Sequence, residues 1–389
     1  MTSVSTKAPA APFDTSSLPA HLPALDGLRG LAILLVLAHM LNLLAPQTDM
    51  VGLLFSHFSY FGWTGVQLFF VLSGFLITGI LIDTQKAQNY FSAFYARRTL
   101  RIFPLYFAVL AVAFIVLPAI GSVPPKIAID QENQVWLWTY LSNWASALGV
   151  GSKAFPHFWS LAVEEQFYLL WPLLIRSRSP RQCVWFCVGI AVASLLLRCV
   201  LAWAGTSDTS IYENSFCRMD ALALGGAAAA AFRIPAWRDR LVAMHNRLLT
   251  WSVILTLAGL VLTHGFWNGT LVGETIGYTI VALMFVLLLM AAAGADAAGA
   301  SGWADLLRLR PLRAVGKYSY AMYIFHKPLH DYVGKPMVMS LNPQVTQSVL
   351  ANVAYIAVGI VVTFAAAFVS WHLFEKHFLQ MKRLFAPQP

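Results

Sequence analysis

Charged residues are scarce in this chain: of its 389 residues, 58% are hydrophobic and only 11% are charged. Soluble globular domains carry charge on roughly a quarter of their residues. So little charge excludes an ordinary soluble domain, because the remaining apolar surface must face lipid. The Lys and Arg residues fall in short clusters between apolar runs, and this pattern signals orientation in a membrane and excludes a nucleic-acid-binding stripe.

Metal-binding and targeting patterns are also absent from the sequence. Its four cysteines, Cys183, Cys187, Cys199 and Cys217, form no CxxC pair, and no histidine stands at metal-ligand spacing. We therefore expect no metal and no permanently bound cofactor. Residues 1–24 are rich in Ala, Pro, Ser and Thr and contain no apolar stretch, so they are expected to be a disordered cytoplasmic segment and not a signal peptide.

Ten apolar segments are candidates for membrane-spanning helices, which need about 20 mainly apolar residues each. Residues 25–378, which contain all ten, are expected to form one transmembrane domain, followed by a short cytoplasmic tail at 379–389. The fold class predicted is an all-α bundle of about ten transmembrane helices. The segments are centred near residues 37, 72, 111, 167, 193, 222, 256, 281, 324 and 361.

The orientation of the bundle follows from its basic residues. Ten spans place both termini on one side of the membrane, and Lys and Arg in short loops mark the cytoplasmic side. Both termini are therefore predicted to be cytoplasmic. The longest loop on the other side, residues 121–156, contains three tryptophans and is expected to lie partly along the outer interface. The basic clusters on the side of the termini lie within residues 86–101, 176–181, 233–247, 308–317 and 376–383.

Ionisable side chains inside membrane spans are costly and usually functional, so they are the candidates for chemistry. In the first span, Arg29 precedes an apolar run that ends at His39, about 15 Å further along a helix. This spacing places His39 near the middle of the membrane. A neutral imidazole there can act as a general base near neutral pH. The alternative is a histidine that only contacts a neighbouring helix.

Arg98 and Arg101 are three residues apart and therefore share one helix face at the cytoplasmic end of the third span. Two planar guanidinium groups in this arrangement can grip the phosphates of an acyl donor. The same pair can also serve only as a positive anchor at the membrane surface. Spacing alone does not decide between these two interpretations.

The fourth predicted span enters the membrane from outside and carries two adjacent carboxylates. His157, Ser160, Glu164 and Tyr168 share one face of this helix, whereas Glu165 turns toward apolar neighbours. Glu164 is therefore predicted to face a pocket. Glu165 is predicted to form a structural tie to an intramembrane arginine.

Two further polar groups occur in later spans. Arg218 and Asp220 precede a run of small residues at 225–228, which allows close helix contact, and an ion pair with another span is expected there. Three more residues share one side of the ninth span, where they form either an acceptor-binding surface or a polar helix contact: Ser319, Tyr323 and His326.

Together these segments resemble the acyltransferase-3 family of membrane-bound O-acyltransferases. The resemblance spans nearly the whole chain and is carried by five motifs in order, at residues 25–39, 65–77, 97–104, 157–172 and 319–328. It implies ten core spans, acyl-CoA as the usual donor, an essential histidine at His39, and an Arg-x-x-Arg motif at Arg98 and Arg101. Members of the family O-acylate surface polysaccharides, lipopolysaccharide, peptidoglycan and some secreted small molecules.

The expected function is therefore transfer of an acyl group, most simply acetyl, from cytoplasmic acyl-CoA to a hydroxyl of a carbohydrate-like acceptor, by a multi-pass protein of the bacterial plasma membrane. Arg98 and Arg101, with Arg29, would bind the donor. His39 would deprotonate the acceptor or carry the acyl group, and Glu164 would orient the imidazole. The competing hypothesis is a proton-coupled transporter or flippase, since buried His, Arg and Glu also suit a substrate path.

Two departures from the family pattern bear on these expectations. In that pattern the histidine follows the arginine by eleven positions, whereas His39 follows Arg29 by ten, which rotates it about 80° away from the face of Arg29. Many relatives also carry a C-terminal extracytoplasmic hydrolase-like domain, which this sequence does not contain. The chain is therefore expected to act alone or to hand its acyl group to a separate extracytoplasmic transferase.

Overall fold

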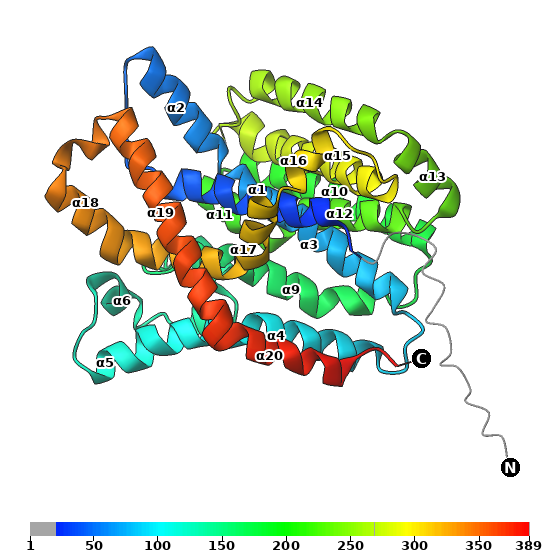
Figure 1. Cartoon of the computed structure of the whole chain (residues 1–389), viewed down its shortest axis with the longest axis horizontal. Coiled ribbons are helices and arrows are strands. Elements are labelled where there is room, and N and C mark those ends of the chain that lie inside the picture. Colours follow the sequence, from blue (N-terminus) through cyan, green and yellow to red (C-terminus); the bar gives the residue numbers. More distant parts are fainter. Residues whose placement is uncertain (1–20, 268, 389) are drawn as a thin grey trace, which may run out of the picture.

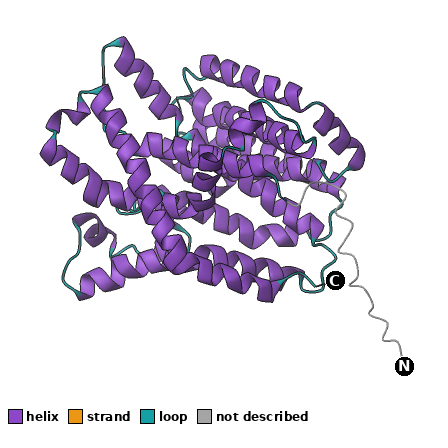
Figure 2. Cartoon of the chain, in the orientation of Figure 1, coloured by secondary structure: helices purple, strands orange, loops and turns teal. Residues whose placement is uncertain are grey.

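The structure, a computed structural model, describes residues 21–267 and 269–388, and within these residues every regular element is a helix (Figure 2). Ten helices of 17–24 residues form the bundle in this described part, and each of the ten predicted span centres falls within one of them. The long helices are α1 (Pro23–Met40), α3 (Thr64–Asp83), α4 (Tyr90–Ala111), α9 (Phe158–Ile175), α10 (Pro180–Trp203), α12 (Ser215–Ala231), α14 (His245–Leu262), α15 (Tyr278–Ala297), α17 (Arg310–Leu329) and α19 (Val349–Ser370).

Seven helical segments within the described ranges are long and apolar enough to cross a membrane. They contain all the long helices except α9, α12 and α17, which carry most of the polar residues singled out above. In α12, 13 of 17 residues are buried, whereas in α14 only three of 18 are. A helix covered by other helices needs no apolar surface, because only lipid-facing positions must be apolar. The predicted all-α polytopic membrane class is confirmed.

Close packing of α3 against α12 depends on two glycines. A Cβ atom on Gly225 would lie 2.1 Å from the carbonyl oxygen of Val71, and one on Gly74 would lie 1.8 Å from that of Leu222. Neither helix can therefore carry a larger residue at its glycine without moving away. The small-residue run expected to permit close contact does so, and α3 and α12 form the centre of the bundle.

Shorter helices, which the apolar pattern does not predict, join the long ones. In the loop after α4, the Asp130 carboxylate accepts hydrogen bonds from the backbone N–H groups of Lys153 (2.8 Å) and Ala154 (2.9 Å), and these bonds close the loop across its base. Tyr106 of α4 donates to the carbonyl of Leu137 (2.8 Å) and holds the loop against the bundle. The short elements are α2 (Met50–Phe61), η1 (Val112–Val116), α5 (Leu117–Ala119), α6 (Pro125–Asp130), α7 (Val135–Trp138), α8 (Ser142–Ala147), α11 (Asp208–Glu213), α13 (Pro235–Ala243), η2 (Gly273–Gly277), α16 (Trp303–Leu307), η3 (His330–Gly334), α18 (Lys335–Leu341), η4 (Pro343–Thr346), η5 (Trp371–Glu375), α20 (Lys376–Gln380) and η6 (Met381–Phe385).

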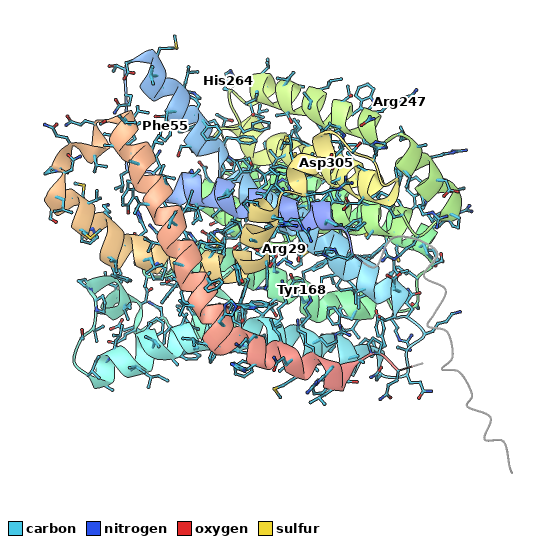
Figure 3. The ribbon with its side chains drawn as sticks, in the orientation of Figure 1. Arg29, Phe55, Tyr168, Arg247, His264 and Asp305 are labelled. Atoms are coloured by element: carbon cyan, nitrogen blue, oxygen red, sulfur yellow. The ribbon has the colours of Figure 1, made fainter. Side chains whose placement is uncertain are left out.

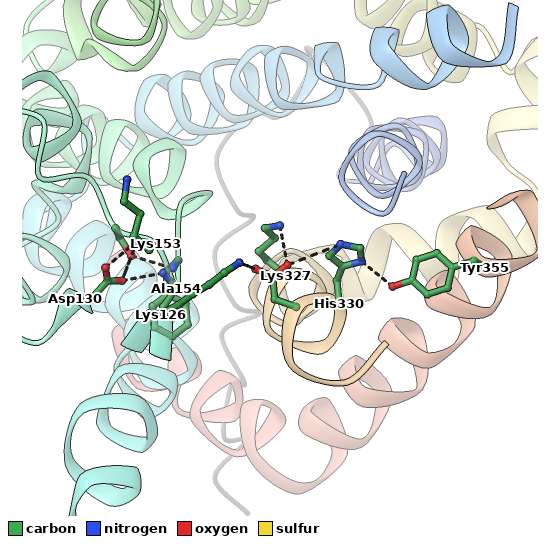
Figure 4. A network of polar contacts seen from close by, with 10 residues as sticks. Lys126, Asp130, Lys153, Ala154, Lys327, His330 and Tyr355 are labelled. Carbon is green, nitrogen blue, oxygen red and sulfur yellow. Dashed lines mark hydrogen bonds and ion pairs between the residues drawn. The ribbon is translucent and has the colours of Figure 1, made fainter. Parts of the chain in front are cut away.

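A second polar network fixes the same loop to two long helices (Figure 4). Lys126 of α6 and Lys327 of α17 both donate to the Asp331 carboxylate, at 2.6 and 2.9 Å. His330, next to Asp331, shares a hydrogen bond of 2.8 Å with the hydroxyl of Tyr355 on α19. The loop, α17 and α19 are thereby tied together at one end of the bundle.

The predicted transmembrane domain is bounded by α1 at its start and by the segment that follows α19 at its end. The first helix begins at Pro23, and proline suits the first position of a helix. Residues 1–20, most of the segment predicted to be disordered, lie outside the described residues. Beyond α19 the chain continues through α20 and η6, which lie along α4 (Figure 1). The cytoplasmic placement of both termini stays a prediction, because a helix bundle alone does not reveal which end faces the cytoplasm.

Candidate active site

A cavity of about 900 Å³ lies between α1, α3, α4, α9 and α17. Pockets of this size hold small-molecule and cofactor ligands. Its lining extends from Thr84, directly after α3, to Ser160 in the first turn of α9, so it reaches through much of the bundle. Arg29 and Tyr168, both labelled in Figure 3, are among the residues that line it. Nine of the residues singled out from the sequence line it: Arg29, Arg98, Arg101, Ser160, Glu164, Glu165, Tyr168, Ser319 and Tyr323.

Positive charge dominates the walls of the cavity. The predicted pair Arg98 and Arg101 is joined there by Arg29 from α1 and by two cations that the motif analysis did not single out. Of the lining carboxylates, Asp83 is engaged in an ion pair with Arg233, which leaves Glu164 and Glu165 to face the cations. Such an excess of positive charge in a low-dielectric site favours a polyanionic ligand. The five cations are Arg29, Arg97, Arg98, Arg101 and Lys382.

Glu164 is held at the centre of this charged wall. Its carboxylate interacts with the hydroxyls of Ser73 and Tyr168 and with the guanidinium of Arg98. The two hydroxyls are hydrogen-bonded to each other, and the Arg98 guanidinium carbon lies 4.9 Å from the centre of the Tyr168 ring. The prediction that Glu164 faces a pocket is confirmed. Ser73 was not singled out, although a hydroxyl within an apolar run was an available signal.

Glu165 also lines the cavity, although its helix face was predicted to turn toward apolar neighbours. Adjacent helix residues point about 100° apart, and a wide cavity can contact both. Glu165 is influenced electrostatically by Arg98 and Glu164, which agrees in part with the predicted tie to an arginine. No hydrogen-bonded ion pair of Glu165 occurs within the described ranges.

Hydroxyl groups line the end of the cavity distant from Thr84, and two histidines pack behind them. The hydroxyls of Ser160 and Tyr323 lie 2.6 Å apart, and each lies 3.1 Å from the backbone carbonyl oxygen of His157, which accepts from this pair. The rings of His157 and His326 lie behind them, with centroids 4.6 Å apart, and neither histidine lines the cavity. In the described part of the chain, neither ring nitrogen of His157 makes a hydrogen bond, nor does Nε2 of His326. Sequence periodicity predicted which of these residues share a helix face. It did not predict that the two helices that carry them are in contact.

His39 lies outside the cavity. It is in the last turn of α1, where its Nδ1 lies 3.2 Å from the carbonyl oxygen of Ser59 and its ring packs edge-on against Tyr60. Among the described residues no contact between His39 and Glu164 is present, so the structure does not show Glu164 orienting this imidazole, and the depth of His39 in the membrane stays a prediction. The helix begins six residues before Arg29, so it is Arg29 that lies toward the middle of α1. The rotation of about 80° between the two side chains agrees with only Arg29 reaching the cavity.

The predicted intramembrane ion pair is present for Asp220 but not for Arg218. The Asp220 carboxylate accepts hydrogen bonds from Arg198 of α10 (2.8 Å) and from Thr279 (2.9 Å). Arg218 instead donates to the Gln67 side chain (2.5 Å) and is surrounded by four aromatic rings: Phe70, Trp159, Tyr212 and Tyr278. Both arginines are fully buried and lie outside the cavity lining.

Removing one member of the Arg198–Asp220 pair is expected to destabilise the protein. In Asp220→Ala, the Arg198 guanidinium would remain buried without its carboxylate, at a cost of about 3–5 kcal/mol. Thermal unfolding of the purified variant in detergent measures this loss. The double variant Arg198→Met, Asp220→Leu is the control, because it removes both charges and should recover most of the stability. An unfolding midpoint that Asp220→Ala leaves unchanged would contradict this expectation.

Comparison with known proteins agrees with the geometry. A family model described as an acyltransferase domain matches residues 22–372. The O-acetyltransferase OatA of Staphylococcus aureus is 28% identical over 349 residues, which cover 84% of this chain and 53% of that protein. The peptidoglycan O-acetyltransferase OatA of Listeria monocytogenes is 26% identical over 351 residues, covering 85% and 52%. The putative peptidoglycan O-acetyltransferase YrhL of Bacillus subtilis is 27% identical over 388 residues, covering 92% and 54%.

The chain thus spans about half the length of these curated relatives. No solved structure matches it. The family model covers nearly the whole bundle, including α1, α4, α9 and α17 with their cavity-lining residues. The chain therefore belongs to the acyltransferase-3 family, the family that its five sequence motifs resemble.

Proposed function

We propose that the chain is an O-acetyltransferase of the bacterial plasma membrane, which transfers an acetyl group from cytoplasmic acetyl-CoA to a hydroxyl of a cell-wall glycan. The observation that carries this proposal is the set of five cations around one cavity inside a membrane bundle. Family membership and relatives named as peptidoglycan O-acetyltransferases support both the reaction and the class of acceptor.

The donor enters the cavity at the end near Thr84, which follows from the predicted cytoplasmic orientation of that loop. Arg29, Arg98 and Arg101 bind its phosphates, since guanidinium groups form paired hydrogen bonds with phosphate oxygens. The flexible pantetheine arm then extends along the cavity toward Ser160 and Tyr323. The bilayer surrounds the bundle, while the acceptor approaches from the opposite side.

Transfer requires the acceptor hydroxyl to attack the thioester carbonyl. A carbon–oxygen bond forms, the carbon–sulfur bond breaks, the hydroxyl proton passes to a base, and CoA leaves as its thiolate. Glu164 acts within the donor cavity, where it balances Arg98 and positions Tyr168. His39 is proposed as the base that receives the proton, at the end of α1 distant from the predicted cytoplasmic entrance.

The decisive experiment uses the purified chain in proteoliposomes with acetyl-CoA labelled in the acetyl group. An O-acetyltransferase is expected to release CoA thiol and to transfer the label to peptidoglycan fragments supplied on the acceptor side. If another extracytoplasmic transferase completes the reaction, label should leave CoA only when that protein is added. Uptake of intact acetyl-CoA into the vesicles without cleavage would overturn the proposal in favour of a transporter.

A further inference from the structure

The segment Met381–Gln388, called the strap below, lies across the end of the cavity near Thr84. Three hydrogen bonds fasten it to the start of α4 and the loop before it. Gln88 N–H donates to the Gln388 carbonyl (3.1 Å), Gln388 N–H donates to the Asn89 side chain (2.8 Å), and that side chain donates to the Ala386 carbonyl (2.9 Å). Figure 1 shows α20, which leads into the strap, lying along α4. Two strap residues, Lys382 and Pro387, line the cavity itself.

Lys382 brings a cation to a place that already holds several. Its ammonium group lies in the field of four arginines, of which Arg101 acts on it most strongly. Its side chain is half-buried, and no carboxylate pairs with it in the part of the chain that the structure describes. Like charges gathered in a partly desolvated site repel one another unless an anion joins them. The arrangement is therefore suited to a ligand with several phosphates.

The order of the cations along the cavity matches the order of phosphates in CoA. Arg29 and Arg98 act on the half-buried carboxylate Glu164, whereas Lys382 belongs to the strap at the entrance, and Arg101 is the arginine that acts most strongly on it. A donor that enters with its thioester foremost places its diphosphate deeper than the 3′-phosphate of its ribose. The three arginines then meet the diphosphate, and Lys382 meets the outermost phosphate.

We infer that Lys382 binds the ribose 3′-phosphate of the donor, so that the strap selects CoA over acyl donors that lack this phosphate. The inference rests on the proposed function, because it assumes that CoA is the donor. It adds a specificity-determining residue from a part of the chain outside all five family motifs. The strap also orders the entrance, since donor and strap contact the same wall of α4.

The test compares the affinities of CoA and 3′-dephospho-CoA for the purified full chain in detergent, measured by calorimetry. Wild type is expected to bind CoA more tightly by roughly tenfold to a hundredfold, the factor of one hydrogen bond to a charged group. Lys382→Ala and Lys382→Gln should weaken CoA binding by this factor and leave the affinity for 3′-dephospho-CoA unchanged. The ratio of the two affinities would then approach one. Lys382→Arg should keep most of the preference.

Arg383→Ala is the matched control, because Arg383 lies next to Lys382 on the strap, is exposed and does not line the cavity. It should retain the full preference for CoA. A Lys382 variant whose affinities for CoA and 3′-dephospho-CoA fall equally, or do not fall, would overturn the inference. CoA binding by the wild-type protein would still support CoA as the donor. If the wild-type protein binds no CoA although thermal unfolding shows that it is folded, both the inference about Lys382 and the proposed donor would be overturned.

Discussion

Replacing Arg98 and Arg101 together by alanine is expected to abolish measurable acetyl transfer while the protein still inserts and folds. Both guanidinium groups line the donor cavity, and a hydrogen bond to a charged group contributes about 1.5–3 kcal/mol. Loss of two such contacts lowers kcat/KM for acetyl-CoA by roughly 10²-fold to 10⁴-fold. Single substitutions by Lys should restore only part of the activity, because an ammonium group cannot reproduce the planar fork of arginine.

The control for this prediction is a basic residue on the same predicted side of the membrane that does not line the cavity. Arg181, near the start of α10, is exposed and meets this requirement. Arg181→Ala should keep full activity and an unchanged orientation in vesicles. Full activity in the Arg98→Ala, Arg101→Ala double variant would contradict the prediction. Both residues would then serve only as positive anchors at the membrane surface, the alternative that their spacing leaves open.

Local features of the cavity were predictable where one helix supplies them. Arg98 and Arg101 share a face because three residues make nearly one turn, and Glu164 shares a face with Ser160 and Tyr168 for the same reason. The cavity confirms both groupings. The long helices were predictable as well, since lipid-facing surfaces require apolar runs.

Features that depend on contacts between distant segments were not predictable. The partner of Asp220 is Arg198 because α10 packs against α12, and nothing in the linear sequence specifies that neighbour. Lys382 reaches the cavity only because α19 continues through α20 and η6 back along α4. The start of α1 at Pro23 was not predictable either, because the composition of that stretch resembles the segment before it.

His39→Ala is expected to reduce acetyl transfer by roughly 10²-fold to 10⁴-fold, the usual effect of losing a general base. His39 lies outside the cavity, so its proposed role rests on the family motif and on the protonation of its ring. Its Nδ1–H donates to the Ser59 carbonyl at 3.2 Å, and this bond leaves the lone pair on Nε2 free to accept a proton. CoA affinity should stay unchanged in the variant, because the arginines proposed to bind the donor phosphates line the cavity and His39 does not. Transfer assays and calorimetry on the same preparation separate the two quantities.

His39→Gln and His57→Ala complete this test. Glutamine can keep a hydrogen bond to Ser59 but cannot take up a proton, so it should be nearly as inactive as alanine. His57, on α2, is exposed, and its one hydrogen bond within the described residues is to the Leu53 carbonyl of its own helix, so its removal should leave transfer unchanged. If His39 only supports the structure, His39→Gln would rescue activity and His39→Ala would lower the unfolding temperature in parallel with turnover. The proton acceptor would then have to come from the buried pair behind Ser160 and Tyr323, where His326 Nε2 makes no hydrogen bond within the described residues.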